Sequence, residues 1–298
     1  MIGAVDIGGT KIAVGMLTTT GKLLARTECP AYPERGLQDG LERIFTMLRE
    51  TAREAGGELE GIGVGCTGPV DPMTGTLEQI QFLPGWQGCH LTAELQNAFG
   101  VTAFLENDAD AAALGELAWG AGRGAKRFIY VTVSTGIGGG LVIDGRLYRG
   151  VDGAHPEIGH HVIDLAGPKC FCGARGCWES LASGPALAAR AGQPSALAVC
   201  QAAEQGDAAA CQAVEQEAAY LGLGFANLIT LFVPDVIALG GGVMHSRALF
   251  WDKILQTIRE NCGLVPFEKT RLVPAQLGLE AGLAGAAQVW IKGSQSND

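Results

Sequence analysis

The sequence predicts an α/β fold made of two similar halves that enclose a cleft. A short apolar strand, a glycine-rich turn, a second strand, a hairpin and a third strand follow one another within residues 2–26. The same order returns at residues 127–148, and alternating helix and strand patterns follow each copy. With 298 residues, the chain is long enough for two domains. Together these observations predict a duplicated domain.

Hydrophobic periodicity supports each element in turn. Apolar residues at helical spacing between residues 37 and 52 predict an amphipathic helix. Short apolar runs predict strands at residues 2–7, 12–17, 23–26, 61–66, 101–105, 127–133, 141–143, 146–148 and 236–239. Further helices are expected at about residues 109–119, 185–203 and 207–231.

Composition excludes several classes of protein. Apolar residues make up 47% of the chain and charged residues 17%, which suits a folded core and excludes a disordered chain. The 45 glycines follow no three-residue period, so they do not indicate collagen. A net charge of −10 lacks the basic footprint of a nucleic-acid binder, but it is compatible with a small anionic ligand.

Location and partners follow from the absence of certain segments. Strand-like residues begin at Ile2, which predicts no signal peptide, and the longest apolar run, residues 221–233, is too short to span a bilayer. We therefore expect a cytoplasmic protein whose cysteines are not paired in disulfides. We also expect a homo-oligomer, a dimer or a tetramer, with no nucleic-acid or membrane partner.

The first glycine-rich turn joins two predicted strands at Gly8-Gly9-Thr10-Lys11. Glycines let backbone N–H groups approach a phosphate, while Thr10 and Lys11 add a hydroxyl and a charge. Asp6, at the end of the preceding strand, is a candidate to hold Mg²⁺ through water. A strand follows this turn, so it is not a Walker A loop. The alternative interpretation is an ordinary tight hairpin.

Two later turns have similar chemistry. Residues 134–140 place Thr135 and Gly136 in a second glycine-rich turn, at the position that corresponds to the first. Residues 237–243 form a strand that enters a third glycine turn, where bare backbone can accept an adenosine ring and ribose. A tight strand-to-helix turn is the alternative for the third. Two phosphate-type hairpins in duplicated positions favour a nucleotide cleft.

A polar segment, Glu106-Asn107-Asp108, lies where a predicted strand becomes a helix. Helix capping alone explains Asn and Asp at such a position. However, Asp110 adds a third carboxylate in a region that has few other charges. A carboxylate here could take the proton from an attacking hydroxyl group.

A cluster of cysteines predicts a metal site. Cys170, Cys172 and Cys177 are two and five residues apart on a loop bent by glycines, and His160 precedes them by ten residues. Three thiolates and one imidazole complete a tetrahedral zinc site, so the zinc would be structural. His161 is a competing ligand, and free thiols packed in a core are the alternative.

In combination, these motifs resemble the ROK family of sugar kinases and repressors, within the actin-like, hexokinase-type ATPases. The resemblance covers nearly the whole chain, and its most specific part is Glu157-Ile158-Gly159-His160 with the run from Cys170 to Glu179. It implies a two-lobed actin-like ATPase fold with a duplicated ribonuclease-H-like core and an interdomain cleft. The small lobe would hold residues 1–108 and a returning C-terminal segment, 280–298. The large lobe would hold residues 109–279 and the zinc loop.

The resemblance also implies an activity and the residues that support it. The activity is ATP-dependent phosphorylation of the 6-hydroxyl of a hexose, most simply glucose, with Mg²⁺. Asp108 would be the catalytic base. The sugar-binding residues would be Gly68, Asn107, Asp108, Glu157, His160 and Glu179. The zinc ligands would be His160, Cys170, Cys172 and Cys177. The nucleotide-binding residues would be Asp6, Gly9, Thr10, Lys11, Thr135, Gly136 and Gly241.

Two departures from the family pattern concern the sugar. Thr67-Gly68 stands where family glucokinases have Pro-Gly, and Phe82 stands where they have a sugar-binding asparagine. The alternative substrate is therefore an N-acetylhexosamine, either N-acetylmannosamine or N-acetylglucosamine. A sugar-sensing repressor is a further alternative. Family repressors carry a DNA-binding domain before the first glycine turn, whereas here that turn begins at Asp6.

Overall fold

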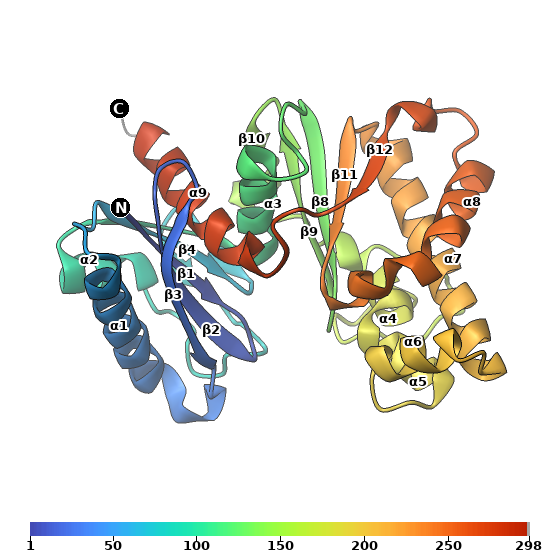
Figure 1. Cartoon of the computed structure of the whole chain (residues 1–298), viewed down its shortest axis with the longest axis horizontal. Coiled ribbons are helices and arrows are strands. Elements are labelled where there is room, and N and C mark those ends of the chain that lie inside the picture. The colour runs from blue at the N-terminus through green and yellow to red at the C-terminus, as the bar shows by residue number, and fades with distance from the viewer. Residues whose placement is uncertain (297–298) are drawn as a thin grey trace. The chain divides into compact units, whose positions relative to one another are not determined.

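The computed structural model describes residues 1–296, which form two compact units (Figure 1). Unit 1 comprises residues 1–124, 140–156 and the C-terminal segment from 276, and unit 2 comprises residues 125–139 and 157–275. The predicted lobe boundaries at residues 108 and 279 stay a prediction. Residues 297–298 of the predicted C-terminal segment lie outside the described residues.

The first sheet lies in unit 1 and has the strand order β3-β2-β1-β4-β7. Strand β1 pairs antiparallel with β2 and parallel with β4, and β4 pairs parallel with β7. The strands are β1 (Ile2–Ile7), β2 (Lys11–Leu17), β3 (Leu23–Pro30), β4 (Gly61–Cys66) and β7 (Thr102–Asn107). Short strands β5 (Val70–Asp71) and β6 (Thr76–Leu77) form a separate ribbon.

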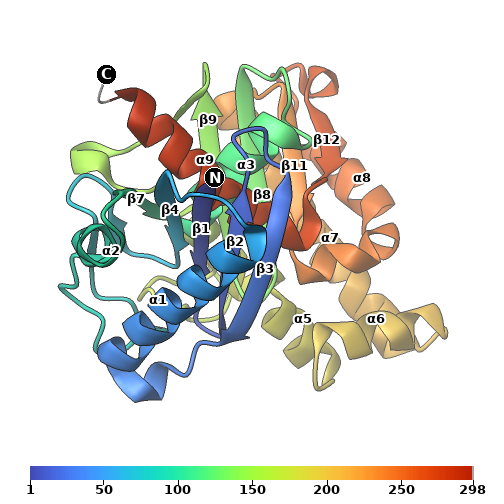
Figure 2. The ribbon, with the colours of Figure 1, turned by 60° about the vertical axis from the view of Figure 1, so that its left-hand side comes forward.

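Helices bury both faces of the central strands of this mixed sheet, in which β1, β4 and β7 run parallel. Helices α1 (Gly36–Ala55) and α2 (Leu91–Phe99) cover one face, where residues such as Val5, Ile44 and Leu95 form a core. Figure 2 shows α1 crossing that face. Helix α9 (Ala281–Ser296) covers the other face and also packs against α3 (Asp108–Trp119).

The register of the parallel strands positions the site. Asp6 pairs with Gly65, which pairs with Glu106, and Cys66 pairs with Asn107. Strand β7 therefore extends two residues beyond the predicted end at Leu105, because Glu106 and Asn107 still pair with β4. The carboxyl ends of β1, β4 and β7 meet at one edge of the sheet.

The second sheet has the order β10-β9-β8-β11-β12, so both sheets arrange their strands as third, second, first, fourth and fifth. This shared order confirms the predicted duplication. The strands are β8 (Arg127–Val133), β9 (Ile137–Ile143), β10 (Arg146–Leu147), β11 (Val236–Gly240) and β12 (Arg271–Pro274). The predicted helix at 185–203 is wrong as one element. It is two helices, because a turn at Gly192 and Pro194 interrupts it.

The helices of unit 2 surround a long central helix. They are α4 (Trp178–Ala182), α5 (Gly184–Ala191), α6 (Ala196–Glu204), α7 (Ala208–Phe232) and α8 (Trp251–Asn261). Trp178 is buried, and its ring meets Phe225 of α7 edge-on at 5.2 Å. Because Trp178 directly follows Cys177, this contact anchors the cysteine loop to the core of unit 2.

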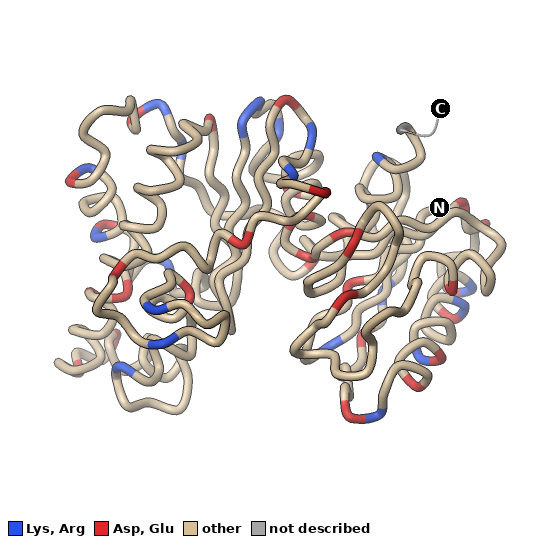
Figure 3. The backbone as a smooth tube through the Cα atoms, turned by 180° about the vertical axis from the view of Figure 1, so that it is seen from behind, with Lys and Arg blue, Asp and Glu red and all other residues tan. Residues whose placement is uncertain are grey.

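Charged residues of both signs are spread over helices, strands and loops. Figure 3 shows acidic and basic residues mixed along α1, where Arg43 and Asp39 form an ion pair of 2.7 Å. Within residues 1–296, no helix combines the length and the apolar character that crossing a membrane requires.

Close contact between α9 and β4 gives a stability prediction. A Cβ atom on Gly63 would lie 1.7 Å from the carbonyl oxygen of Ala286. Because that atom is backbone and cannot move aside, Gly63→Ala should lower the free energy of unfolding by at least about 3 kcal/mol. In the matched control Gly263→Ala, a Cβ meets no described atom within 4 Å, and stability should stay within about 1 kcal/mol. Denaturant titration of both variants makes the comparison, and equal stabilities would contradict this packing.

Candidate active site

The carboxyl edge of the first sheet brings together four of the predicted site residues in unit 1. Asp6 lies on β1, Gly68 follows β4, and Asn107 and Asp108 lie where β7 becomes α3. A Cβ atom on Gly68 would lie 3.0 Å from the Asn107 amide nitrogen, so Gly68 packs against that side chain. Ligands of α/β proteins commonly bind at this edge of a sheet.

Asn107 and Asp108 have different local roles. The Asn107 side-chain oxygen caps α3 by accepting the N–H groups of Ala109 at 2.9 Å and Asp110 at 3.3 Å. Asn107 is buried, whereas Asp108 is partly exposed, and its Oδ1 accepts the Ala109 N–H at 2.8 Å. Helix capping therefore accounts for Asn107, but it does not account for the partly exposed carboxylate of Asp108 beside it.

The carboxylates of Asp6 and Asp108 act on each other electrostatically. Burial, and then the charge of Asp108, raise the pKa of Asp6 to about 7, while Lys11 opposes the rise. Helix α9 contributes to the burial, since a Cβ atom on Gly282 would lie 2.3 Å from Asp6 Oδ2. Such a pair of carboxylates is an arrangement that favours a divalent cation or a proton.

The first glycine-rich turn is a tight hairpin at the end of β1. The Gly8 N–H donates to the Lys11 carbonyl at 2.9 Å, so Gly9 and Thr10 form the tip. Lys11 extends to Glu28, 3.3 Å away. Phe82 is 52% exposed and lies directly on the turn, because a Cβ on Gly9 would be 2.7 Å from its Cβ. Phe82 therefore lies at the surface, packed against the first glycine-rich turn, and is not part of the core.

The second glycine-rich turn, in unit 2, contacts a predicted sugar ligand. The Glu179 Oε2 atom accepts the Ile137 N–H at 2.8 Å, and a Cβ on Gly136 would lie 2.4 Å from the same oxygen. The other oxygen of Glu179 lies 4.0 Å from Nε2 of His160. Glu157 is exposed, and its carbonyl accepts the His160 N–H at 3.0 Å. Unit 2 therefore brings together Gly136, Glu157, His160 and Glu179.

The predicted zinc ligands converge in the same unit. The ligand atoms of His160, Cys170, Cys172 and Cys177 all lie within 4.8 Å of one another. Cys172 Sγ is 3.6 Å from Cys177 Sγ, and Cys170 Sγ is 3.5 Å from His160 Nδ1. Tetrahedral zinc with Zn–S bonds of about 2.3 Å requires separations of roughly 3.5–3.8 Å. The donor set and its spacing both fit zinc.

The two neighbouring histidines have distinct positions. His160 presents Nδ1 to Cys170 and Nε2 to Glu179, so one ring joins the cysteine loop to a predicted sugar ligand. His161 instead places Nδ1 2.5 Å from the Ile158 carbonyl and stacks at a tilt on Trp178. Of the two, the geometry assigns the ligand role to His160.

A cavity of about 460 Å³ lies at the carboxyl ends of β8 and β11 in unit 2. Ser134 and Thr135 line it after β8, Gly242 and Val243 after β11, and residues of α5 and α6 close the far side. Its volume lies within the range of small-molecule pockets. Gly241 supports the wall: its φ is 91°, and a Cβ there would lie 2.3 Å from the Val133 carbonyl oxygen.

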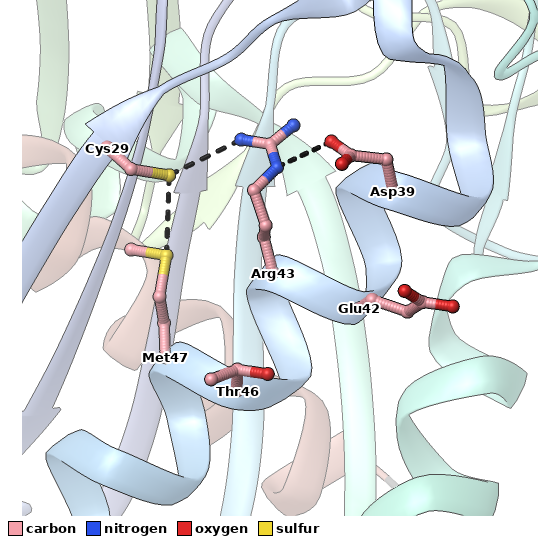
Figure 4. Close-up of a pocket in the computed structure, with 6 residues that line it drawn as sticks. All are labelled: Cys29, Asp39, Glu42, Arg43, Thr46 and Met47. Atoms are coloured by element: carbon pink, nitrogen blue, oxygen red, sulfur yellow. Dashed lines mark hydrogen bonds and ion pairs between the residues drawn. The ribbon is translucent and has the colours of Figure 1, made fainter.

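A second cavity, of about 340 Å³, lies between β3 and α1 in unit 1 (Figure 4). Its side chains already bond to one another. Arg43 donates to Asp39 at 2.7 Å and lies 3.4 Å from the Cys29 sulfur, and it also donates to the carbonyls of Pro30 and Ala31. These bonds hold the chain after β3 against α1, which is a structural role.

Two residues near the candidate base were not predicted from sequence. Arg149 and His155 both bond to Asp110, at 2.7 Å each, and Arg149 also bonds to Glu106. Arg149 and His155 are 39 and 45 residues from Asp110 in the sequence, so a single sequence gives no sign that they are in contact with it. The one available signal was a basic residue at each end of a short loop rich in glycine.

Comparisons with known proteins identify the family of the chain. The family model described as ROK family matches residues 2–293. The chain belongs to the ROK family. A relative from Thermotoga maritima named glucokinase is 33% identical over 305 residues, which cover 96% of this chain and 95% of that protein.

Two solved ROK structures resemble the chain along nearly its whole length. A ROK hexokinase from Thermus thermophilus is 38% identical, with a TM-score of 0.88 and 99% of each chain covered. A ROK glucokinase from Streptomyces griseus, in complex with glucose and AMPPNP, is 32% identical, with a TM-score of 0.83 and coverage of 97% and 98%. These likenesses confirm the predicted actin-like ATPase fold.

The raised pKa of Asp6 predicts how stability depends on pH. The folded protein binds a proton at Asp6 up to about pH 7, whereas the unfolded chain releases it near pH 4, so this contribution to stability is lost as pH rises toward 7. Asp6→Asn removes the loss. Without divalent metal, its gain over wild type should already be present at pH 5, where the unfolded chain has released the proton, and should grow by about 1–3 kcal/mol between pH 5 and pH 8.

The control is Asp71→Asn. Hydrogen bonds, chiefly from the Thr74 hydroxyl, lower the pKa of Asp71, so it stays ionised in both the folded and the unfolded chain between pH 5 and 8. Its effect on stability should not change over that range. Thermal denaturation at pH 5 and pH 8 measures the stability of each variant relative to wild type. If the stability difference between Asp6→Asn and wild type is the same at both pH values, the ionised carboxylates of Asp6 and Asp108 do not destabilise the fold.

Proposed function

We propose that this chain transfers the γ-phosphoryl group of ATP to the 6-hydroxyl of a hexose, and that glucose is the hexose it prefers. The proton of the hydroxyl passes to the Asp108 carboxylate, the hydroxyl oxygen bonds to phosphorus, and the bond to ADP breaks. The products are ADP and a hexose 6-phosphate. The main support is the partly exposed Asp108 carboxylate at the carboxyl edge of the parallel strands, next to Asn107 and Gly68.

The nucleotide is assigned to the glycine turns and to the cavity in unit 2. Ser134, Thr135 and Gly242 line that cavity with hydroxyl groups and bare backbone, which suits the ribose and phosphates of ATP. Gly9, Thr10 and Lys11 supply amides, a hydroxyl and a charge on the first turn. The ROK glucokinase crystallised with AMPPNP supports ATP as the donor.

Mg²⁺ fits Asp6, because the neighbouring Asp108 charge disfavours a second bare anion there and a divalent cation would offset it. When bound with ATP, Mg²⁺ neutralises charge on the phosphates. The residues of this chain then have to place the hydroxyl, accept its proton and exclude water. We assign those roles to Asn107, Asp108 and the residues around them.

The sugar is assigned to Gly68, Asn107 and Asp108 of unit 1 and to Glu157, His160 and Glu179 of unit 2. Glucose is preferred over an N-acetylhexosamine because the curated relative named glucokinase and the ROK structure with bound glucose both match almost the full chain. Phe82 offers an apolar ring where a polar sugar ligand is expected. The rate of ADP release with glucose, mannose, fructose, N-acetylglucosamine and N-acetylmannosamine tests the assignment, and a faster rate with an N-acetylhexosamine would overturn it.

Replacement of the base tests the mechanism. Asp108→Asn keeps the size of the side chain but removes the proton acceptor, so kcat should fall by about 10²–10⁴ with a modest change in KM for the sugar. The control is Asp207→Asn, at another helix N-terminus, where Asp207 caps α7 through the Ala210 N–H at 2.8 Å. It should keep the wild-type kcat. Steady-state kinetics decide, and a near-normal kcat for Asp108→Asn would place the base elsewhere.

We also propose that His160, Cys170, Cys172 and Cys177 bind one structural zinc ion. The ion would hold the cysteine loop in shape, and His160 and the adjoining Glu179 would keep their places in the sugar site. Two observations support this proposal: the four ligand atoms converge, and His160 Nε2 lies 4.0 Å from a Glu179 carboxylate oxygen. Zinc takes no part in the transfer, since the four protein ligands fill its coordination sphere.

Loss of one thiolate should therefore affect sugar binding before nucleotide binding. Cys172→Ser should lower the zinc content from about one ion per chain and weaken glucose binding about tenfold or more, with ATP binding changed less than threefold. Cys211→Ser is the matched control, since Cys211 is also exposed but lies on α7 outside the ligand group. Elemental analysis and separate titrations of the two ligands measure this. Wild-type protein without zinc, or a zinc-free variant with normal glucose affinity, would contradict the proposal.

A further inference from the structure

A largely buried cluster of acidic and basic side chains lies at the strand–helix junction that carries the candidate base, and the chemistry above does not use it. We name it the Arg149 cluster, and it consists of Glu106, Asp110, Arg149 and His155, all in unit 1. Arg149 bonds to Glu106 through one nitrogen and to Asp110 Oδ2 through the other, at 2.7 Å for the second bond. His155 Nδ1 lies 2.7 Å from the same Asp110 oxygen.

The two acidic residues of the cluster flank Asn107 and Asp108 in the chain: Glu106 directly precedes Asn107, and Asp110 follows Asp108 by two residues. Glu106 Oε1 accepts the backbone N–H of Asn107 at 2.9 Å. The backbone N–H of Asp110 donates to the Asn107 side chain at 3.3 Å. The cluster therefore holds the strand end before this pair and the first helical turn after it.

The basic residues reach the cluster from the two ends of one closed loop. Between Arg149 and His155, the Gly150 N–H donates to the Ala154 carbonyl at 2.8 Å, and the Ala154 N–H donates to the Val151 carbonyl at 3.0 Å. The loop is thus internally bonded, and both of its ends attach to Asp110. One loop, fixed at two points, is held against the strand–helix junction.

Because the cluster is buried, its carboxylates need hydrogen-bond donors in fixed positions. The side chain of Asp110 is fully buried, and that of Glu106 is 7% exposed. A buried carboxylate without a partner is costly, so both anions require the donors of Arg149 and His155. The planar guanidinium holds two carboxylates at fixed angles, which a flexible ammonium would not do.

We propose that Arg149 and His155 are positioning residues for phosphoryl transfer. By holding Glu106 and Asp110 in place, they fix the short segment between these residues, which includes Asn107 and Asp108, at the angle that the attacking hydroxyl requires. The inference rests on the proposed kinase function. The reaction is sensitive to such placement, because a shift of about 1 Å at a reacting group can cost about 10²-fold in rate.

The first test compares two replacements of His155. His155→Ala removes the bond to Asp110, whereas His155→Asn keeps a side-chain donor near the position of Nδ1. His155→Ala should lower kcat about tenfold and leave KM for ATP within twofold of wild type, and His155→Asn should restore most of the loss. A role in folding alone would lower the melting temperature in step with activity and would not give this separation of kcat from KM.

The second test measures the pH dependence of kcat/KM in Arg149→Met. Without the guanidinium, the Asp110 carboxylate loses its main counter-charge. Burial raises the pKa of Glu106 to about 7 even with Arg149 beside it, so Glu106 should take up a proton in this variant, and the uncompensated charge is that of Asp110. Asp6 also acts on Asp108, and His155 faces Asp110. The added negative potential should raise the pKa of Asp108, so the acidic limb of the profile should move to higher pH. Arg146→Met, an exposed position on β10, is the control and should keep the wild-type profile.

The outcomes separate this inference from the proposed function. Wild-type protein that phosphorylates no hexose would refute the proposed function, and the inference with it. Active wild type with normal kcat in His155→Ala, or with equal losses in His155→Ala and His155→Asn, would overturn the positioning role alone. If Arg149→Met does not fold, the His155 pair still decides between these results.

Discussion

The parallel register of β1, β4 and β7 is the constraint on which the site in unit 1 depends. Because Asp6, Gly65 and Glu106 pair in one row, each residue that follows these strands reaches the same edge. The sheet can bury that edge only if α9 lies very close to it, and Gly63 and Gly282 leave the space for the helix. This close packing removes water from Asp6 and raises its pKa to about 7. The close packing of α9 against the sheet therefore affects both the stability of the fold and the pKa of Asp6.

The same topology has a different use in unit 2. There the strand ends carry hydroxyl groups and glycine instead of carboxylates, and the space above them is a cavity of about 460 Å³. Glu179 follows the cysteine loop directly and reaches the backbone of the glycine turn at Ile137. One duplicated order of strands thus supports two kinds of binding surface, because the residues after each strand differ.

Local features were predictable from the sequence, and distant contacts were not. The glycine turns, the Glu106–Asp108 segment and the cysteine spacing depend on residues close in the chain. The structure brings the four proposed zinc ligands within 4.8 Å of one another, and zinc binding itself stays a prediction. The end of β7 was missed because pairing with β4 determines it. Arg149 was missed because its partners lie about 40 residues away, and no periodicity reports such a contact. The cytoplasmic location, the homo-oligomer and the absence of nucleic-acid or membrane partners stay predictions.

The carboxylates at the edge of unit 1 fall into two groups that differ in what neutralises them. Glu106 and Asp110 face the guanidinium of Arg149, and Asp110 also faces His155, so their charges serve to hold the backbone. Asp6 and Asp108 instead repel each other, and the nearby Lys11 offsets only part of that repulsion at Asp6. A proton from a substrate hydroxyl or a cation carried by a nucleotide would relieve it. The protein therefore balances the charges that hold the junction internally, and under the proposed function the repulsion between Asp6 and Asp108 is relieved when the substrates bind.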